Sequence, residues 1–173
     1  MTGASAPGTP EEEPSLFDPV NRDRVRPSVK ALIIRDDRLL VTVNSDRSGP
    51  FQLLPGGGQE FGESLVEALR RECREEISLE VEVGDLVAVR DYIGAHHEFA
   101  AWDSHYHQIE LIFEASIAAD AEPRVGPDSD TFQTGVHWLP LAELDAAPLY
   151  PAALKTWLRL DADRRPTYLG DVN

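Results

Sequence analysis

The most constraining feature of this sequence is a glycine run that leads into a capped helix. The run Gly56–Gly58 predicts a tight turn or loop, because glycine takes backbone angles that are closed to other residues. Ser64 and Glu67 have the spacing of a capping box, and no Gly or Pro interrupts residues 65–77. One apolar stripe follows a spacing of four, at Leu65, Leu69 and Cys73. The segment therefore predicts a glycine loop followed by one amphipathic helix.

The same helix carries acidic residues that do not help it to fold. Glu72, Glu75 and Glu76 lie three or four positions apart or side by side, so they occupy neighbouring surface positions. Like charges there destabilise a helix, whereas clustered carboxylate oxygens are the ligands that Mg²⁺ or Mn²⁺ prefers. Glu63 comes just before the helix and can reach the same cluster. The alternative is a solvated acidic face of the helix with no further role.

The charge of the chain points in the same direction. With 31 Asp and Glu against 16 Lys and Arg, the net charge is −15. This argues against nonspecific binding to nucleic acid or to anionic membranes, which needs a basic face. A carboxylate and a phosphate about 4 Å apart repel by roughly 4 kcal/mol at an effective dielectric near 20. A phosphate-processing site in this chain therefore needs cations between the two, although an acidic surface also serves solubility.

The length of 173 residues suits one domain with a substantial core. Residues 1–23 are rich in Pro, Gly, Ser and Glu, which predicts a disordered tail, and residues 24–173 are expected to form the domain. No apolar run is long enough to span a bilayer, and no secretory signal is visible. The single cysteine, Cys73, excludes an intramolecular disulfide and favours a cytoplasmic protein.

The rest of the sequence predicts strands around this helix. Apolar runs predict strands at 28–35, 38–43, 51–54, 81–92, 106–117 and 136–139, the first two as a hairpin across a turn at Asp36-Asp37. Gly84-Asp85 interrupts the fourth strand. A short helix is expected at 141–144 and a last one at 150–160, with Pro151 in its first turn. This order favours an α/β (α+β) fold in which helices pack on a mixed β-sheet.

One motif joins the glycine run to the acidic helix. After Gly57 come five residues and Glu63, then seven residues and the sequence Arg71, Glu72, Cys73, Arg74, Glu75, Glu76, Ile77, Ser78, Leu79. This stretch resembles the Nudix box of the MutT-like Nudix hydrolase family, and the preceding Leu54–Gly58 is similar to the usual approach to that box. Cys73 takes a slot for an aliphatic residue, and Ser78 stands where the box has glycine. That glycine normally ends the helix, so Ser78 bears on the turn more than on the glutamates.

The resemblance implies a Nudix-like α/β/α sandwich and a hydrolase that uses Mg²⁺ or Mn²⁺. Its expected reaction is attack by metal-activated water on the diphosphate (pyrophosphate) bond of a nucleoside diphosphate linked to another moiety. In this interpretation Glu72 and Glu76 are the leading metal ligands, and Glu75 is a ligand or the base. Glu63 and the Gly57 carbonyl are supporting ligands. Arg71 holds the glutamates in place by an ion pair, which suits guanidinium geometry.

In this family the general base can also come from a loop outside the box. The candidates in this chain, between which the sequence does not choose, are Asp128, Asp130, Glu98, Asp103 and Glu110. Four histidines, His96, His97, His105 and His107, lack the cysteine partners or the helical pair of a zinc site.

The sequence does not identify the substrate. Ala95 stands where the subfamily that cleaves ADP-ribose has proline, and Tyr92 lies too early for the tyrosine that marks dinucleoside polyphosphate hydrolases. No intact coenzyme A signature precedes the box. Two alternatives stay open: a catalytically silent nucleotide-binding or regulatory module, and an isoprenoid-diphosphate isomerase of the same fold. The intact box carboxylates count against both, and a homodimer is expected by analogy.

Overall fold

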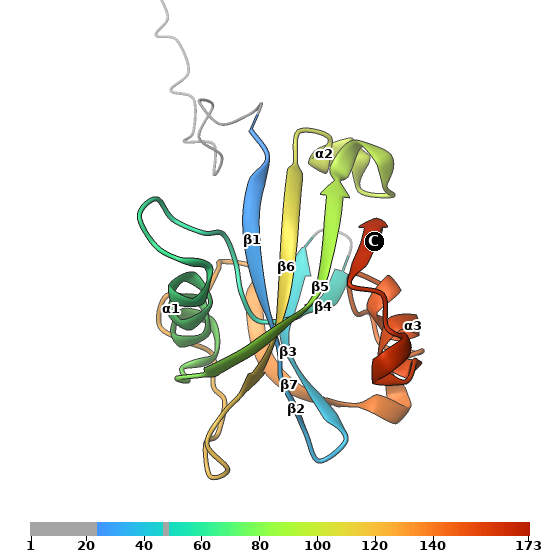
Figure 1. Ribbon diagram of the computed structural model, residues 1–173. Helices are drawn as coiled ribbons and strands as arrows, with labels where there is room; N and C mark the ends of the chain where they lie inside the picture. The colour runs from blue at the N-terminus through green and yellow to red at the C-terminus, as the bar shows by residue number, and fades with distance from the viewer. Residues whose placement is uncertain (1–23, 47–48) are drawn as a thin grey trace, which may run out of the picture.

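The computed structural model describes residues 24–46 and 49–173, and within these ranges the strands form two four-stranded sheets. The order is β1-β6-β5-β8 in one sheet, and β2-β3-β4 with β7 paired to β3 in the other. Helix α1 lies on one side of the sheets and α3 on the other, which gives three layers (Figure 1). The expected tail at 1–23 falls outside the described residues, and the domain extent of 24–173 stays a prediction.

The first sheet is mixed, as the sequence predicts. It contains β1 (Arg26–Leu32), β5 (Glu82–Ile93), β6 (His107–Ser116) and β8 (Tyr168–Asp171). Strand β6 runs parallel to β1 and antiparallel to β5, and β8 runs parallel to β5. The interruption expected at Gly84-Asp85 is a shift of register between Val83 and Leu86 within one continuous strand. No strand was predicted at 168–171.

The second sheet contains β2 (Ile34–Arg35), β3 (Arg38–Asp46), β4 (Gly49–Leu53) and β7 (Gln133–Pro140). The turn at Asp36-Asp37 is confirmed, with φ of 51° and 55° at the two residues. The hairpin predicted between 28–35 and 38–43 is only partly right. Only β2 pairs with β3, whereas β1 belongs to the other sheet. The sequence is apolar on both sides of Ile33, and β1 and β2 both contain fully or partly buried residues. Hydrophobicity therefore does not show that the chain passes from one sheet to the other at Ile33.

Helix α1 (Leu65–Ile77) forms where the sequence predicts it, because its start and end signals are local. Ser64 and Glu67 form the reciprocal capping box. At the other end, Ser78 takes the left-handed conformation, with φ 57° and ψ 32°, and its amide donates to the Arg74 carbonyl. The serine therefore adopts the backbone conformation that glycine favours at this position. The helix buries the expected apolar face against β1 and β6, with Ala68, Leu69, Cys73 and Ile77 inside.

Helix α3 (Ala153–Arg159) is shorter than the predicted 150–160. It begins after a cis Tyr150–Pro151 peptide, so Pro151 precedes the helix. Leu154, Trp157 and Leu158 belong to a hydrophobic core separate from the one under α1, and this core includes residues of both sheets. The short helix expected at 141–144 is the 3₁₀ turn η3 (Leu141–Glu143), and a similar turn, η4, spans Ala162–Arg164.

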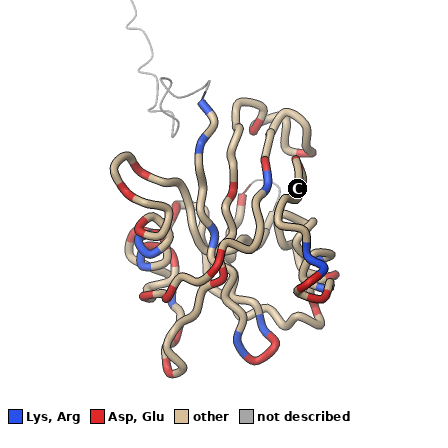
Figure 2. The backbone as a smooth tube through the Cα atoms, viewed as in Figure 1, with Lys and Arg blue, Asp and Glu red and all other residues tan. Residues whose placement is uncertain are grey.

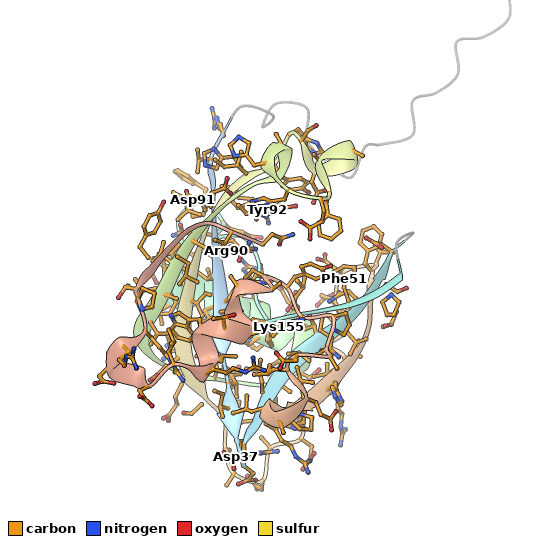
Figure 3. All side chains as sticks on the ribbon, turned by 90° about the vertical axis from the view of Figure 1, so that its right-hand side faces the viewer. Asp37, Phe51, Arg90, Asp91, Tyr92 and Lys155 are labelled. Atoms are coloured by element: carbon orange, nitrogen blue, oxygen red, sulfur yellow. The ribbon has the colours of Figure 1, made fainter. Side chains whose placement is uncertain are left out.

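The connection between β5 and β6 contains a 3₁₀ turn, η2 (Gly94–His96), and one turn of helix, α2 (Ala100–Asp103). Figure 3 shows Arg90 and Tyr92 of β5 in the part of the molecule that also carries Phe51, away from the Asp36-Asp37 turn. No helix in the described ranges is long and apolar enough to cross a membrane.

Candidate active site

The glycine run lies alongside β1 and is tied to it by backbone hydrogen bonds. The Val29 amide donates to the Gly57 carbonyl at 2.8 Å, and the Ala31 amide to the Pro55 carbonyl at 2.8 Å. Gly56 has a φ of 128°, and a Cβ added to it would collide with the Val29 carbonyl oxygen. Only glycine therefore lets the loop approach β1 this closely while it changes direction.

The carbonyl groups of all three glycines accept hydrogen bonds from side chains. Lys30 Nζ donates to the Gly56 carbonyl, and Ser28 Oγ donates to the Gly57 carbonyl at 3.1 Å. Arg71 Nη2 donates to the Gly58 carbonyl at 2.9 Å. The Gly57 oxygen, predicted as a supporting metal ligand, thus already accepts two hydrogen bonds. A cation would have to compete with one of these donors.

Arg71 connects the loop to the glutamates of the box. Its guanidinium pairs with Glu63 at 2.7 Å, with Glu72 at 2.9 Å and with Glu75 at 3.0 Å. The side chain is 19% exposed, so these ion pairs are only partly screened by solvent. Hydrogen bonding from Arg71 lowers the pKa of Glu63. Figure 2 shows basic and acidic positions close together along α1.

Glu76 lies on the side of α1 that faces the glycine loop. Its Oε2 accepts a hydrogen bond from the Gly56 amide at 2.8 Å, and burial raises the pKa of the carboxyl to about 7. Burial also raises the pKa of Glu72. A Cβ on Gly57 would come within 2.6 Å of the Glu72 carboxyl carbon, so glycine leaves room for this carboxylate. Both side chains would therefore be stabilised as anions by a nearby cation.

The loop between β6 and β7 docks on the C-terminal end of α1. The amides of Arg124 and Gly126 donate to the carbonyls of Ile77 and Glu76, each at 3.1 Å. Gln133 Nε2 also donates to the Glu76 carbonyl, at 2.7 Å. Only glycine fits at position 126, because an added Cβ would collide with the Glu75 carbonyl. This docking satisfies carbonyl groups that a helix end leaves free, and it brings residues 128–130 to the glutamates.

The result is a pocket of about 140 Å³ at the junction of β1, the glycine loop, α1 and the β6–β7 loop. Its lining residues are Arg26, Gly57, Gly58, Glu72, Glu75, Glu76, Asp128 and Asp130. The structure thus brings together the glutamates at 72, 75 and 76 with two of the acids predicted as candidate bases. Glu63 lies beside the pocket, bound to Arg71.

The other three candidate bases lie elsewhere. Glu110 forms a buried ion pair with Arg90 at 2.6 Å across the β5–β6 register. Asp103 accepts a hydrogen bond from the Tyr92 hydroxyl at 2.7 Å, and Glu98 is exposed on the β5–β6 connection. Among the histidines, His96 and His97 both hydrogen-bond to Asp171, at 2.7 Å each.

The pocket is suited to a divalent cation by its donor chemistry. In the described part of the chain, no three His, Cys, Asp or Glu side chains are arranged as a ready ligand set. Glu72 and Glu75 are turned to Arg71, and Glu76 to the Gly56 amide. Oxygen donors from carboxylates are nevertheless what Mg²⁺ and Mn²⁺ bind, and they converge here on one small pocket.

Residues 24–160 match the family model of the NUDIX domain. The chain belongs to the Nudix family. This membership confirms the Nudix-like α/β/α sandwich and identifies the protein as an enzyme of the hydrolase class that acts on phosphorus-containing acid anhydrides. A search of curated proteins finds no match to this Nudix chain.

Solved structures of Nudix proteins resemble this one. A MutT NUDIX hydrolase from Burkholderia pseudomallei is 28% identical, with a TM-score of 0.55 over 69% of this chain and 86% of that one. A NUDIX hydrolase from Nitrosomonas europaea is 19% identical, with a TM-score of 0.64 over 86% and 78%. An ADP-ribose pyrophosphatase from Streptococcus suis is 20% identical, with a TM-score of 0.57 over 86% and 98%. The last two are too distant in sequence to show more than the fold.

Sequence reasoning missed the contributions of β1 to this Nudix site. Arg26 lines the pocket, and Lys30 holds the Gly56 carbonyl. The available signal was the alternation of polar residues at 26, 28 and 30, which puts these side chains on one face of the strand. It was not interpretable without knowing that β1 runs beside the glycine loop.

Proposed function

We propose that this Nudix hydrolase cleaves the diphosphate bond in a nucleoside diphosphate linked to another moiety, with Mg²⁺ or Mn²⁺ as cofactor. The observation that carries this proposal is the convergence of Glu72, Glu75, Glu76, Asp128 and Asp130 on one pocket beside the glycine loop. Such a pocket repels a phosphate strongly unless cations lie between them, which is why a metal is part of the proposal. Bound divalent cations would neutralise the diphosphate and lower the pKa of a coordinated water.

The residues of the chain have separate tasks in this proposal. Glu72 and Glu76 hold the cation, since they lie closest to the glycine loop and are the more enclosed of the box carboxylates. Arg71 fixes the positions of the box glutamates through its ion pairs and takes no part in proton transfer.

A proton must leave the attacking water, and three acids can accept it from within the pocket. One is Glu75 of α1, whose side chain is 33% exposed and bound to Arg71. The other two are Asp128 and Asp130 of the β6–β7 loop, which also line the pocket. Single Asp→Asn and Glu→Gln variants at these positions separate them, because loss of the base removes the dependence of kcat on a deprotonated group.

The names of two fold relatives agree with the proposed substrate class. One is an ADP-ribose pyrophosphatase, 20% identical, and one is a UDP-X diphosphatase, 18% identical with a TM-score of 0.62. Both names describe a nucleoside diphosphate joined to another group. At these identities the likeness shows the fold alone, so the pocket carries the argument for the chemistry.

A substrate screen tests the proposal. The protein is incubated with a library of nucleoside diphosphate derivatives, with Mg²⁺, with Mn²⁺ and with EDTA, and phosphate is measured after a phosphatase releases it from the products. We expect turnover of at least one derivative that depends on the divalent cation. Binding of library members without turnover of any would instead support the nucleotide-binding or regulatory module.

A further inference from the structure

Each side chain on the polar face of β1 contacts one glycine of the glycine run. Lys30 Nζ hydrogen-bonds to the Gly56 carbonyl, and Ser28 Oγ to the Gly57 carbonyl. Arg26 comes next on the same face, and its guanidinium lies against Gly58, where an added Cβ would collide with it. Gly58 therefore leaves the space that Arg26 occupies. The alternation of β1 thus places a guanidinium in the lining of the acidic pocket.

Within residues 24–46 and 49–173, no carboxylate forms an ion pair with Arg26 that would explain its position. Among the described residues that line the pocket, Arg26 is the one cation, and it forms no salt bridge with a described carboxylate. It belongs to neither hydrophobic core and is exposed. The guanidinium of the other arginine near the site, Arg71, already binds three glutamates and the Gly58 carbonyl.

A charge count shows what a substrate needs at this place. The described lining carries five carboxylates, at Glu72, Glu75, Glu76, Asp128 and Asp130. Even two divalent cations would leave this set with a net charge of about −1, and a diphosphate brings at least two more negative charges. Lys30 also acts on Glu72 and Glu76, but its amine is bound to the Gly56 carbonyl, so a further positive charge next to the phosphates would stabilise a bound diphosphate. A guanidinium supplies it in a planar, two-pronged form that matches phosphate oxygens.

We propose that Arg26 binds the nonbridging oxygens of the diphosphate group of the substrate in this pocket. The proposal rests on the proposed function, since it assumes that the ligand of the pocket carries a diphosphate. Arg26 then touches substrate, whereas Ser28 and Lys30 on the same strand position the glycine loop.

The test uses methylenediphosphonate, a diphosphate analogue that cannot be hydrolysed. Its binding is measured by calorimetry in Mg²⁺ for the wild type, Arg26→Gln, Arg26→Lys and the control Arg70→Gln, which removes an exposed arginine of α1. We expect Arg26→Gln to weaken binding at least tenfold, Arg26→Lys to weaken it less, and Arg70→Gln to leave it unchanged. Equal binding by Arg26→Gln and the wild type would overturn the proposal, as would a wild type that does not bind the analogue.

Steady-state kinetics with a nucleoside diphosphate derivative that the enzyme hydrolyses provide the second measurement. Arg26→Gln should raise KM more than it lowers kcat, with an unchanged thermal unfolding midpoint, since the side chain is exposed and outside the core. A lower unfolding midpoint with an unchanged KM would assign Arg26 a structural role and overturn the proposal. If the wild type turns over no library member but needs Arg26 for the analogue, the hydrolase proposal fails and the assignment of Arg26 stands.

Discussion

Arg71 holds Glu63 through two hydrogen bonds, from Nε to Oε2 at 3.2 Å and from Nη2 to Oε1 at 2.7 Å. This paired geometry is specific to a guanidinium, because an ammonium group cannot present two parallel donors. Glu63 precedes α1, and Arg71 lies two turns into it. The pair therefore fixes how the glycine loop enters the helix that carries Glu72, Glu75 and Glu76.

Arg71→Lys should reduce both stability and activity. We expect the free energy of unfolding to fall by about 1–2 kcal/mol, as charged hydrogen bonds are lost and half-buried carboxylates lose their partner. Because the glutamates lose their fixed positions, kcat should fall at least tenfold. Urea denaturation and steady-state kinetics measure the two effects, with Arg70→Lys as the exposed control. Wild-type kcat in Arg71→Lys would show that the ion pairs do not position the site.

Substituting two glycines with positive φ distinguishes the cost of backbone strain from the cost of close packing. Gly56 has φ 128° and Gly62 has φ 95°, but a Cβ on Gly62 would meet nothing within 4 Å. Gly62→Ala should therefore cost only the strain, about 1–3 kcal/mol. Gly56→Ala adds a collision with the Val29 carbonyl, so its loss of unfolding free energy in urea denaturation should be larger by about 1–3 kcal/mol, the usual cost of overpacking. Equal losses would mean that the loop moves away from β1 at little cost.

Ser78→Gly should stabilise the protein. Ser78 has φ 57°, a conformation that costs an L-residue about 1–2 kcal/mol, and the extra chain entropy of glycine offsets part of the gain. We expect an increase of roughly 0.5–1 kcal/mol in the free energy of unfolding, with activity within a few-fold of the wild type. Ser78→Ala, which keeps the strain, is the control. A large rise in kcat would show instead that serine weakens the catalytic site.

Asp171 should contribute stability that is lost in acid. Partial burial raises the pKa of Asp171, but hydrogen bonds from His96, His97 and the Ile93 amide outweigh it and bring the pKa to about 2. A carboxyl with a lowered pKa stabilises the fold fully above its unfolded value near 3.8. The contribution is lost as the pH falls from about 4 to about 2.

Urea titrations of the wild type and Asp171→Asn measure this effect. Their difference in unfolding free energy should be about 2 kcal/mol between pH 5 and pH 6 and should shrink below pH 4. A difference that does not change down to the acid limit of the folded state would show that the carboxylate charge is not involved.

Local signals made α1 predictable, and non-local pairing explains the errors. The capping box at Ser64 and the glutamate spacing depend only on neighbouring residues, so helix and box follow from the sequence. Strand β8 is short, contains Gly170, and forms only because β5 is there to pair with it. Glu110 was a candidate base because, on its strand, it could face the same cleft. Its partner is Arg90, which lies opposite it through the β5–β6 register.

The positions of Asp128 and Asp130 also depend on tertiary structure. They reach the pocket because the loop docks at Gly126 against the end of α1, a contact between residues about 50 apart in the chain. Arg26 is the same kind of case. Its place in the pocket follows from the antiparallel β-bridge between Ser28 and Gly58, which cannot be predicted from the sequence.

Glu76→Gln tests the central claim most directly, through the rate of metal-dependent hydrolysis of the best library substrate. The variant keeps the size of the side chain and removes the charge that would hold the cation. We predict that kcat falls by at least two orders of magnitude, with an unchanged or raised thermal unfolding midpoint, because burial disfavours the carboxylate. Glu80→Gln, at an exposed position, should match the wild type. Near-wild-type hydrolysis by Glu76→Gln would contradict the assignment of this pocket as the metal-dependent active site.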